Sequence, residues 1–157
     1  MSEKAVQPQS VVLLVIGYGN PLRSDDGVGA KVAAAVDELG LPGVAVLVCH
    51  QLTPELAEPI SEARAVVFVD AAADASTEVQ VRRLEPADGT QLITHAANPQ
   101  TLLTLAKQLF GRCPPAWWLT IPVENLGFGE SLSARAEAGL KVAIAHIQEF
   151  HRRFCIS

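Results

Sequence analysis

The sequence predicts an α/β fold, a three-layer sandwich in which helices flank a mostly parallel twisted sheet. Short apolar segments alternate with stretches of helical periodicity along the chain, a pattern typical of parallel sheets. The first apolar segment is a continuous run, as expected for a strand buried on both faces. No repeat or low-complexity linker interrupts the series, so we expect a single domain over 1–157, with 1–10 as a flexible N-terminus.

Strands are expected where apolar residues run together or alternate with polar ones. The expected strands are Val11 to Ile16, Val44 to Cys49, Ala65 to Val69, Glu78 to Leu84 and Trp117 to Ile121. The charges in the fourth strand indicate an edge position. Its direction is open, and an antiparallel orientation is one option.

Helices are expected where apolar residues recur every three or four positions. The expected helices are one from about Gly27 that Gly40 ends, a short one from Thr53-Pro54-Glu55 toward Ala63, one that Asn98-Pro99 caps, and a last one from about Ser131 to Phe154. Serine, threonine and asparagine at helix starts, and glycine at helix ends, match their known capping preferences.

Charge and hydropathy exclude several classes of partner. The net charge is -5, and adjacent basic residues occur only in the pairs Arg82-Arg83 and Arg152-Arg153. We therefore expect no nucleic acid and no anionic membrane as a partner. The apolar run Val11 to Ile16 is too short for a signal-peptide core or a membrane span, which predicts a cytoplasmic protein.

The number and spacing of the cysteines predict no disulfide framework. Cys49, Cys113 and Cys155 are odd in number and lack C-x-x-C spacing, which argues against both disulfides and a structural zinc site. Cys113 could be an exposed nucleophile, and Cys49 lies beside His50. A cysteine peptidase is nevertheless disfavoured, because adjacent strand residues point to opposite faces and cannot easily pair as nucleophile and base.

The most informative stretch is the glycine-rich segment from Val15 to Gly29, VIGYGNPLRSDDGVG. A glycine-rich loop after a first strand often cradles a phosphate. Here Asp25 and Asp26 occupy that place, and a phosphate charge about 5 Å away would be repelled by roughly 3 kcal/mol at an effective dielectric constant of about 20. The glycine spacing also fails the nucleotide fingerprints. The loop therefore favours a cation or a peptide.

A simpler interpretation is that one of these aspartates caps the helix beginning near Gly27. One cap explains one aspartate. A second carboxylate, Asn20 and four glycines within thirteen residues exceed what capping needs, which favours a functional loop.

Several other polar residues follow predicted strands. Asp26 follows the first strand, His50 the second and Asp70 the third, while His95 follows the short segment 92–94. In an open parallel sheet these carboxyl ends share one edge, where ligands bind. Carboxylates and imidazoles together suit zinc, nickel or similar ions. Each residue also has a purely structural interpretation, as a turn cap, a residue before a helix or a partner of a backbone carbonyl.

The segment GYGNPLRSDDGVG resembles the N-terminal signature of the nickel-iron hydrogenase maturation endopeptidases. That family removes a C-terminal extension from the hydrogenase large subunit after nickel insertion. The resemblance continues through Phe68-Val-Asp-Ala71, the segment around His95 and Ile121-Pro-Val-Glu-Asn125, and so covers nearly the whole chain. It implies the same three-layer architecture, and a nickel-iron hydrogenase large-subunit precursor as the partner.

The resemblance also matches Asp26, Asp70 and His95 to the family's three metal-contacting positions. It implies that the substrate supplies the nickel, with another divalent ion able to replace it in vitro. The candidate catalytic residues are Asp25, Asp26 and Asp70, with Asp25 serving in loop positioning or proton transfer. His50 matches no family ligand.

Three roles for the metal stay open at this point: polarising the scissile carbonyl, activating water, or serving only as a recognition handle. Two other functions also stay open. One is a self-contained zinc hydrolase on the same sheet, and the other is a noncatalytic metal-dependent chaperone of the precursor tail.

Overall fold

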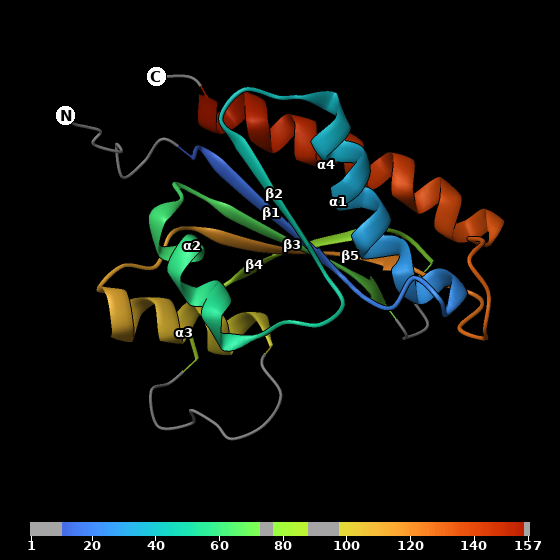
Figure 1. Ribbon diagram of the computed structural model, residues 1–157. Coiled ribbons are helices and arrows are strands. Elements are labelled where there is room, and N and C mark those ends of the chain that lie inside the picture. The colour runs from blue at the N-terminus through green and yellow to red at the C-terminus, as the bar shows by residue number, and fades with distance from the viewer. Residues whose placement is uncertain (1–10, 73–76, 88–97, 156–157) are drawn as a thin grey trace.

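The computed structural model describes residues 11–72, 77–87 and 98–155. They form a three-layer α/β sandwich around a five-stranded sheet of order β2-β1-β3-β5-β4 (Figure 1). The strands are β1 (Leu13–Tyr18), β2 (Val44–Cys49), β3 (Val66–Ala72), β4 (Gln80–Leu84) and β5 (Ala116–Pro122). The predicted fold class is confirmed, while the expected N-terminus at 1–10 and the segment 92–94 lie outside the described residues.

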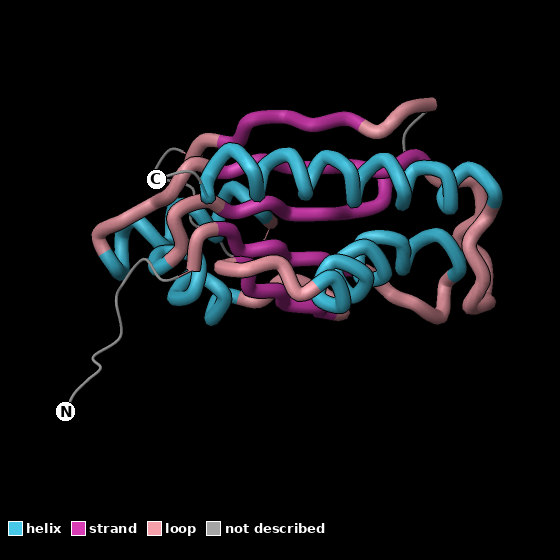
Figure 2. The backbone as a smooth tube through the Cα atoms, turned by 90° about the horizontal axis from the view of Figure 1, so that it is seen from above, coloured by secondary structure: helices cyan, strands magenta, loops and turns pink. Residues whose placement is uncertain are grey.

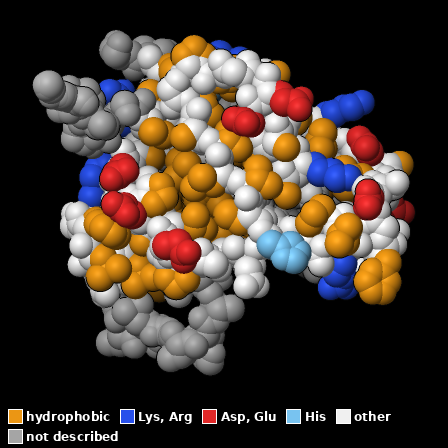
Figure 3. All heavy atoms as spheres, in the orientation of Figure 1, with side chains coloured by type: hydrophobic (Ala, Val, Ile, Leu, Met, Phe, Trp, Pro, Cys, Tyr) orange, Lys and Arg blue, Asp and Glu red, His pale blue; other side chains and the backbone are white. Residues whose placement is uncertain are grey.

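All strand pairings except one are parallel. β1 pairs with β2 and β3, and β3 pairs with β5, in parallel. β4 pairs antiparallel with β5 at the edge of the sheet, which confirms the edge position and fixes the direction that the sequence left open. β2 forms the other edge and is only partly buried, with Val48 exposed. In Figure 3 hydrophobic side chains accordingly gather over this side of the molecule.

Helices cover both faces of the sheet. They are α1 (Val28–Leu39), α2 (Ala57–Glu62), α3 (Pro99–Phe110) and α4 (Ala134–Cys155), with two 3-10 turns, η1 (Ser24–Gly27) and η2 (Pro54–Leu56). α1 and α4 pack on one face and α2 and α3 on the other, and Figure 2 shows α4 lying over the strands. Among the described residues, no helix combines the length and the apolar character needed to cross a bilayer.

The last helix begins at Ala134, later than the expected start near Ser131. Ser133 ends the preceding loop, and its hydroxyl accepts a hydrogen bond from Ala136 N at 3.1 Å. This is the contact that an N-cap side chain makes. The start of α4 is therefore set by the cap and not by the apolar periodicity.

Two glycines let α1 lie directly on the sheet. A Cβ atom added to Gly17 on β1 would overlap the carbonyl oxygen of Gly29, and one added to Gly29 on α1 would overlap the carbonyl oxygen of Val69 on β3. Backbone therefore meets backbone at this crossing. Close packing explains these two of the four glycines that the sequence suggested for a functional loop.

Substituting Gly29 by alanine is expected to lower the free energy of unfolding by about 3 kcal/mol, because the new methyl group meets backbone atoms that cannot rotate away. Gly127→Ala is the matched control, since its Cβ would touch only Asn125 Oδ1 at 3.3 Å and should change stability by less than about 0.5 kcal/mol. Urea denaturation measures both. Equal losses in the two variants would contradict the close packing of α1.

Candidate active site

The carboxyl ends of the central strands bring polar side chains together. Asp70 on β3 pairs in register with Thr120 on β5, and Tyr18 follows the Gly17–Val69 pair at the end of β1. Because side chains alternate along a strand, Tyr18 and Asp70 share the face of Ile16 and Phe68, which is covered by α2 and α3. This edge is where open parallel sheets bind ligands.

Asp26 lies in the loop that follows β1, within η1. It is partly buried, and its Oδ2 accepts a hydrogen bond from the backbone N–H of Asn20 at 2.8 Å. Its charge raises the pKa of Asp70. The structure therefore places two of the three predicted metal contacts, Asp26 and Asp70, within electrostatic reach of each other.

The carboxyl group of Asp70 is held in an unfavourable place for a charge. Burial raises its pKa from 3.8 to about 6, and the nearby Asp26 contributes to the rise. Contact with Tyr18 and a 2.7 Å hydrogen bond from its neighbour's backbone, Ala71 N, act in the opposite direction. At neutral pH Asp70 is thus a poorly solvated carboxylate within electrostatic reach of a second one, and a nearby cation would favour its charged form.

Tyr18 is a site residue that the sequence interpretation missed. Burial, then the charge of Asp70, raise the pKa of its hydroxyl far above the ordinary value, and the indole of Trp118 lies beside it. The hydroxyl therefore stays protonated and can donate to Asp70. Strict alternation along the expected first strand, extended by two residues, would have placed Tyr18 on the face of Ile16.

Asp25 has a different environment from Asp26. It is fully buried, with 0% exposure, and its carboxylate accepts hydrogen bonds from Glu124 N at 2.8 Å, Asn125 N at 3.0 Å, Ser133 N at 2.7 Å and Ser133 Oγ at 2.7 Å. Burial alone would raise the pKa of Asp25, but these hydrogen bonds hold it below the ordinary value. Asp25 is thus an ionised group that ties the loop after β1 to the start of α4.

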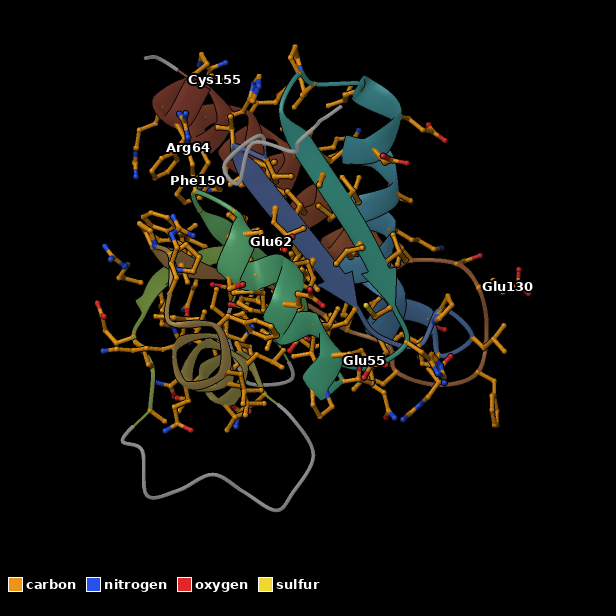
Figure 4. All side chains as sticks on the ribbon, turned by 60° about the vertical axis from the view of Figure 1, so that its left-hand side comes forward. Glu55, Glu62, Arg64, Glu130, Phe150 and Cys155 are labelled. Atoms are coloured by element: carbon orange, nitrogen blue, oxygen red, sulfur yellow. The ribbon has the colours of Figure 1, made fainter. Side chains whose placement is uncertain are left out.

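Further hydrogen bonds join the loop after β1 to the segment 122–133. Ser24 N donates to Gly129 O at 2.8 Å, and Gly129 N donates to Leu22 O at 2.9 Å. Arg23 Nε donates to Leu126 O at 3.2 Å. Figure 4 labels Glu130 on this loop, at the end of the molecule that also carries Glu55. These hydrogen bonds from the segment 122–133 therefore hold the loop that carries Asp26 in place.

Of the two predicted histidines, only His50 falls within the described residues. His95 lies outside the described residues. His50 is exposed and follows the edge strand β2. Within the described residues, no three histidine, cysteine, aspartate or glutamate side chains lie close enough together to hold a metal ion, so Asp26 and Asp70 form at most part of a site.

The thiols at partly buried positions are poorly suited to nucleophilic chemistry. Burial raises the pKa of Cys49 and of Cys113, and the charge of Glu85 adds to the rise at Cys113. Since the thiolate is the reactive form, both groups are less reactive than a free cysteine. The structure gives no support to the disfavoured cysteine peptidase.

A scan against protein-family models and a search of the curated proteins find no match to the chain. Solved structures do match it. The NiFe hydrogenase maturation protease HycI from Thermococcus kodakarensis superposes with a TM-score of 0.70 at 23% identity, over 89% of this chain and 92% of that one. The hydrogenase maturating endopeptidase HybD from E. coli superposes with a TM-score of 0.67 at 22% identity, over 90% and 92%.

The chain has the fold of the hydrogenase maturation proteases. The hydrogenase 2 maturation peptidase from a Thaumarchaeota archaeon agrees, with a TM-score of 0.64 at 21% identity over 87% of this chain and 95% of that one. In this maturation protease fold, Asp26 and Asp70 lie at the edge of the sheet where the parallel strands end. The hydrogen bonds of Asp25 hold the loop after β1 beside them.

Proposed function

We propose that the chain is an endopeptidase that removes the C-terminal extension of a nickel-iron hydrogenase large-subunit precursor after nickel insertion, in the cytoplasm. The fold shared with maturation proteases supports the reaction class. One observation within the chain carries the proposal further: at the ligand-binding edge of that fold, Asp26 lies near enough to Asp70 for its charge to raise the pKa of Asp70. They are the residues that the sequence resemblance matched to metal contacts.

In this proposal the nickel is part of the substrate. Asp26 and Asp70 contact the nickel of the precursor, and His95, from outside the described residues, supplies the third contact. Two carboxylates that repel each other gain most from a cation that arrives between them. The same carboxylates would bind a nickel-free precursor much less well, which makes the enzyme a checkpoint for finished sites.

The three candidate aspartates divide into two roles. The carboxylate of Asp25 is fully buried and already accepts four hydrogen bonds, so we assign it to positioning the loop. Asp26 and Asp70 remain for contact with the substrate. A bound cation favours the ionised form of a carboxyl group, so the pKa of about 6 belongs to Asp70 before the nickel of the precursor arrives.

Incubating the purified chain with nickel-loaded precursor, and analysing the precursor by mass spectrometry, tests this function. The wild type should release the tail. Asp26→Asn should slow release at least about 100-fold, because loss of a close charge contact costs about 3 kcal/mol. Glu38→Gln, an exposed carboxylate on α1, is the control and should cleave normally. Tail binding without cleavage by the wild type would support the chaperone instead.

The purified chain should contain little metal, since the described part of the site offers only two carboxylates and an open site without its substrate holds a cation weakly. Elemental analysis after dialysis measures this. About one zinc per chain that survives dialysis would contradict the substrate-supplied metal and support the self-contained zinc hydrolase.

A further inference from the structure

The two edges of the sheet differ in how they are protected. β4 carries Arg82 and Arg83, and charged residues on an edge strand discourage pairing with another chain. β2, at the other edge, has the sequence VAVLVC, without a charge or a proline, and it pairs with β1 in unbroken register. Among residues 11–72, 77–87 and 98–155, no strand covers its outer side. β2 is thus an uninterrupted apolar edge that is open to a further strand.

The backbone groups on this open side belong to alternate residues of β2. In a strand the N–H and C=O of one residue point to the same side, and those of the next residue point to the other side. Gly19 N donates to Cys49 O at 3.2 Å, so Cys49 and Leu47 face β1. Val46 and Val48 therefore turn their N–H and C=O groups outward. Both residues present a donor and an acceptor to a further strand, and the side chain of Val48, which is 54% exposed, adds an apolar contact.

The open edge leads to the candidate active site. The parallel strands end where Asp26 and Asp70 lie, and Figure 4 shows β2 running toward the end of the molecule that carries Glu55. Gly19, which bonds to the last residue of β2, belongs to the same loop as Asp26. Asn20, the next residue, donates its backbone N–H to Asp26 Oδ2 at 2.8 Å. A peptide that lies along β2 therefore ends beside the loop that carries Asp26.

We propose that the outer edge of β2 binds the C-terminal extension of the precursor, which adds to the sheet as an antiparallel strand. The inference rests on the proposed function, because that function makes the extension the segment that follows the cut bond. Pairing along an edge strand is a common mode of peptide recognition, in which the backbone supplies affinity and alternate side chains supply specificity. Since this mode needs no folded partner, it suits a terminal extension.

The direction and register of the added strand follow from the place of the cut. The extension begins beside Asp70 and leads away from the edge where the parallel strands end, so along β2 it runs opposite to that strand. Because β1 and β2 lie between β3 and the open edge, the extension must cross about 14 Å, which about four extended residues span. About the fifth residue of the extension then lies opposite Val48, and we expect it to be apolar because it packs against that side chain.

Hydrogen exchange of the ¹⁵N-labelled chain, followed by NMR, tests the proposal with a synthetic peptide of the extension at millimolar concentration. In the free chain the amides of Val46 and Val48 should exchange at least about tenfold faster than that of Leu47. With the peptide they should slow at least about tenfold, while the amides of β4, the other edge, stay unchanged. No slowing at Val46 and Val48, or slowing at β4 instead, would overturn the proposal. Slowing that depends on protein concentration alone would identify a second copy of the chain as the occupant and would also overturn it.

Peptides methylated on backbone nitrogens separate strand addition from binding in a pocket. Every second N–H of an antiparallel strand points to its neighbour. Two peptides are therefore compared, methylated at the odd or at the even positions beyond about the fourth residue. One should bind at least about tenfold more weakly than the unmodified peptide, because it lacks the N–H groups that face β2, and the other less than about twofold more weakly. Each peptide is the matched control for the other, and equal effects would contradict strand addition.

Val48→Pro removes an outward N–H from β2 and keeps the bonds of Cys49 and Leu47 to β1, since an edge strand tolerates proline where the N–H faces outward. Its KM for the nickel-loaded precursor should rise at least about tenfold, with kcat within about twofold of the wild type, and circular dichroism checks its fold. If Val48→Pro does not fold, the methylated peptides test the same hydrogen bonds from the other strand. No tail release by the wild type would contradict the proposed function, whereas release with equal KM by both proteins would overturn only the docking of the extension on β2.

Discussion

Replacing Asp70 by asparagine is expected to make the protein more stable at neutral pH and, at the same time, to abolish removal of the precursor tail. Burial and the charge of Asp26 raise the pKa of Asp70 from 3.8 to about 6. Keeping this group ionised above pH 6 therefore costs folding free energy, about 2 kcal/mol when one pKa unit is about 1.4 kcal/mol and partial solvation is allowed for. Asparagine keeps the shape and removes that cost.

The sign of the pH dependence follows from the raised pKa. Between about pH 4 and pH 6 the folded chain binds more protons at Asp70 than the unfolded chain does, so the contribution of this group to stability falls as pH rises. The contribution is complete below the unfolded value of 3.8 and is lost above about 6. The free energy of unfolding of the wild type should therefore drop below that of Asp70→Asn by a growing amount as the pH rises through this window.

Urea denaturation of both proteins at pH 4 and at pH 7.5 measures the effect, and the tail-release assay is run on the same samples. We expect a stability gain at pH 7.5 together with an activity loss of at least about 100-fold. A less stable Asp70→Asn at both pH values would show that Asp70 stabilises the fold. Normal cleavage by this variant would remove Asp70 from the site.

The opposite result is expected for Asp25. Replacing Asp25 by alanine removes an acceptor of four hydrogen bonds and leaves the backbone N–H groups of Glu124, Asn125 and Ser133 without that partner. The free energy of unfolding should fall by about 3 to 5 kcal/mol, as for other broken buried charge networks. Because the pKa of Asp25 is lowered, its contribution is present at neutral pH and is lost as pH falls below about 4.

Asp26→Asn is the matched control, since it changes the adjacent aspartate, whose carboxylate accepts one hydrogen bond from Asn20 N. It should cost less than about 1 kcal/mol. Urea denaturation at pH 7 compares the two variants directly. If Asp25→Ala were no less stable than Asp26→Asn, the tie between the first loop and α4 would not contribute to folding.

The strands and helices could largely be predicted because their signals are local. Apolar runs predicted β1 and β2, and Asn98 and Pro99 predicted the start of α3, where Asn98 Oδ1 accepts from Thr101 N at 2.9 Å. The different roles of Asp25 and Asp26 could not be predicted. Adjacent identical residues look alike in a sequence, and the partners that distinguish them lie about a hundred positions away.

The site was predicted only in part for the same reason. The positions of Asp26 and Asp70 at one edge follow from the parallel direction of the strands, whereas the contact of Asp70 with Tyr18 depends on the pairing of β1 with β3. His95 stays a prediction.

The rate of tail release from nickel-loaded and nickel-free precursor tests the checkpoint most directly. A cation between Asp26 and Asp70 can contribute several kcal/mol, and each 1.4 kcal/mol changes binding about tenfold. With the wild-type chain we therefore predict release at least about 100-fold faster from the nickel-loaded precursor. Equal rates from the two precursors would contradict the account and leave recognition of the tail sequence as the sole basis of specificity.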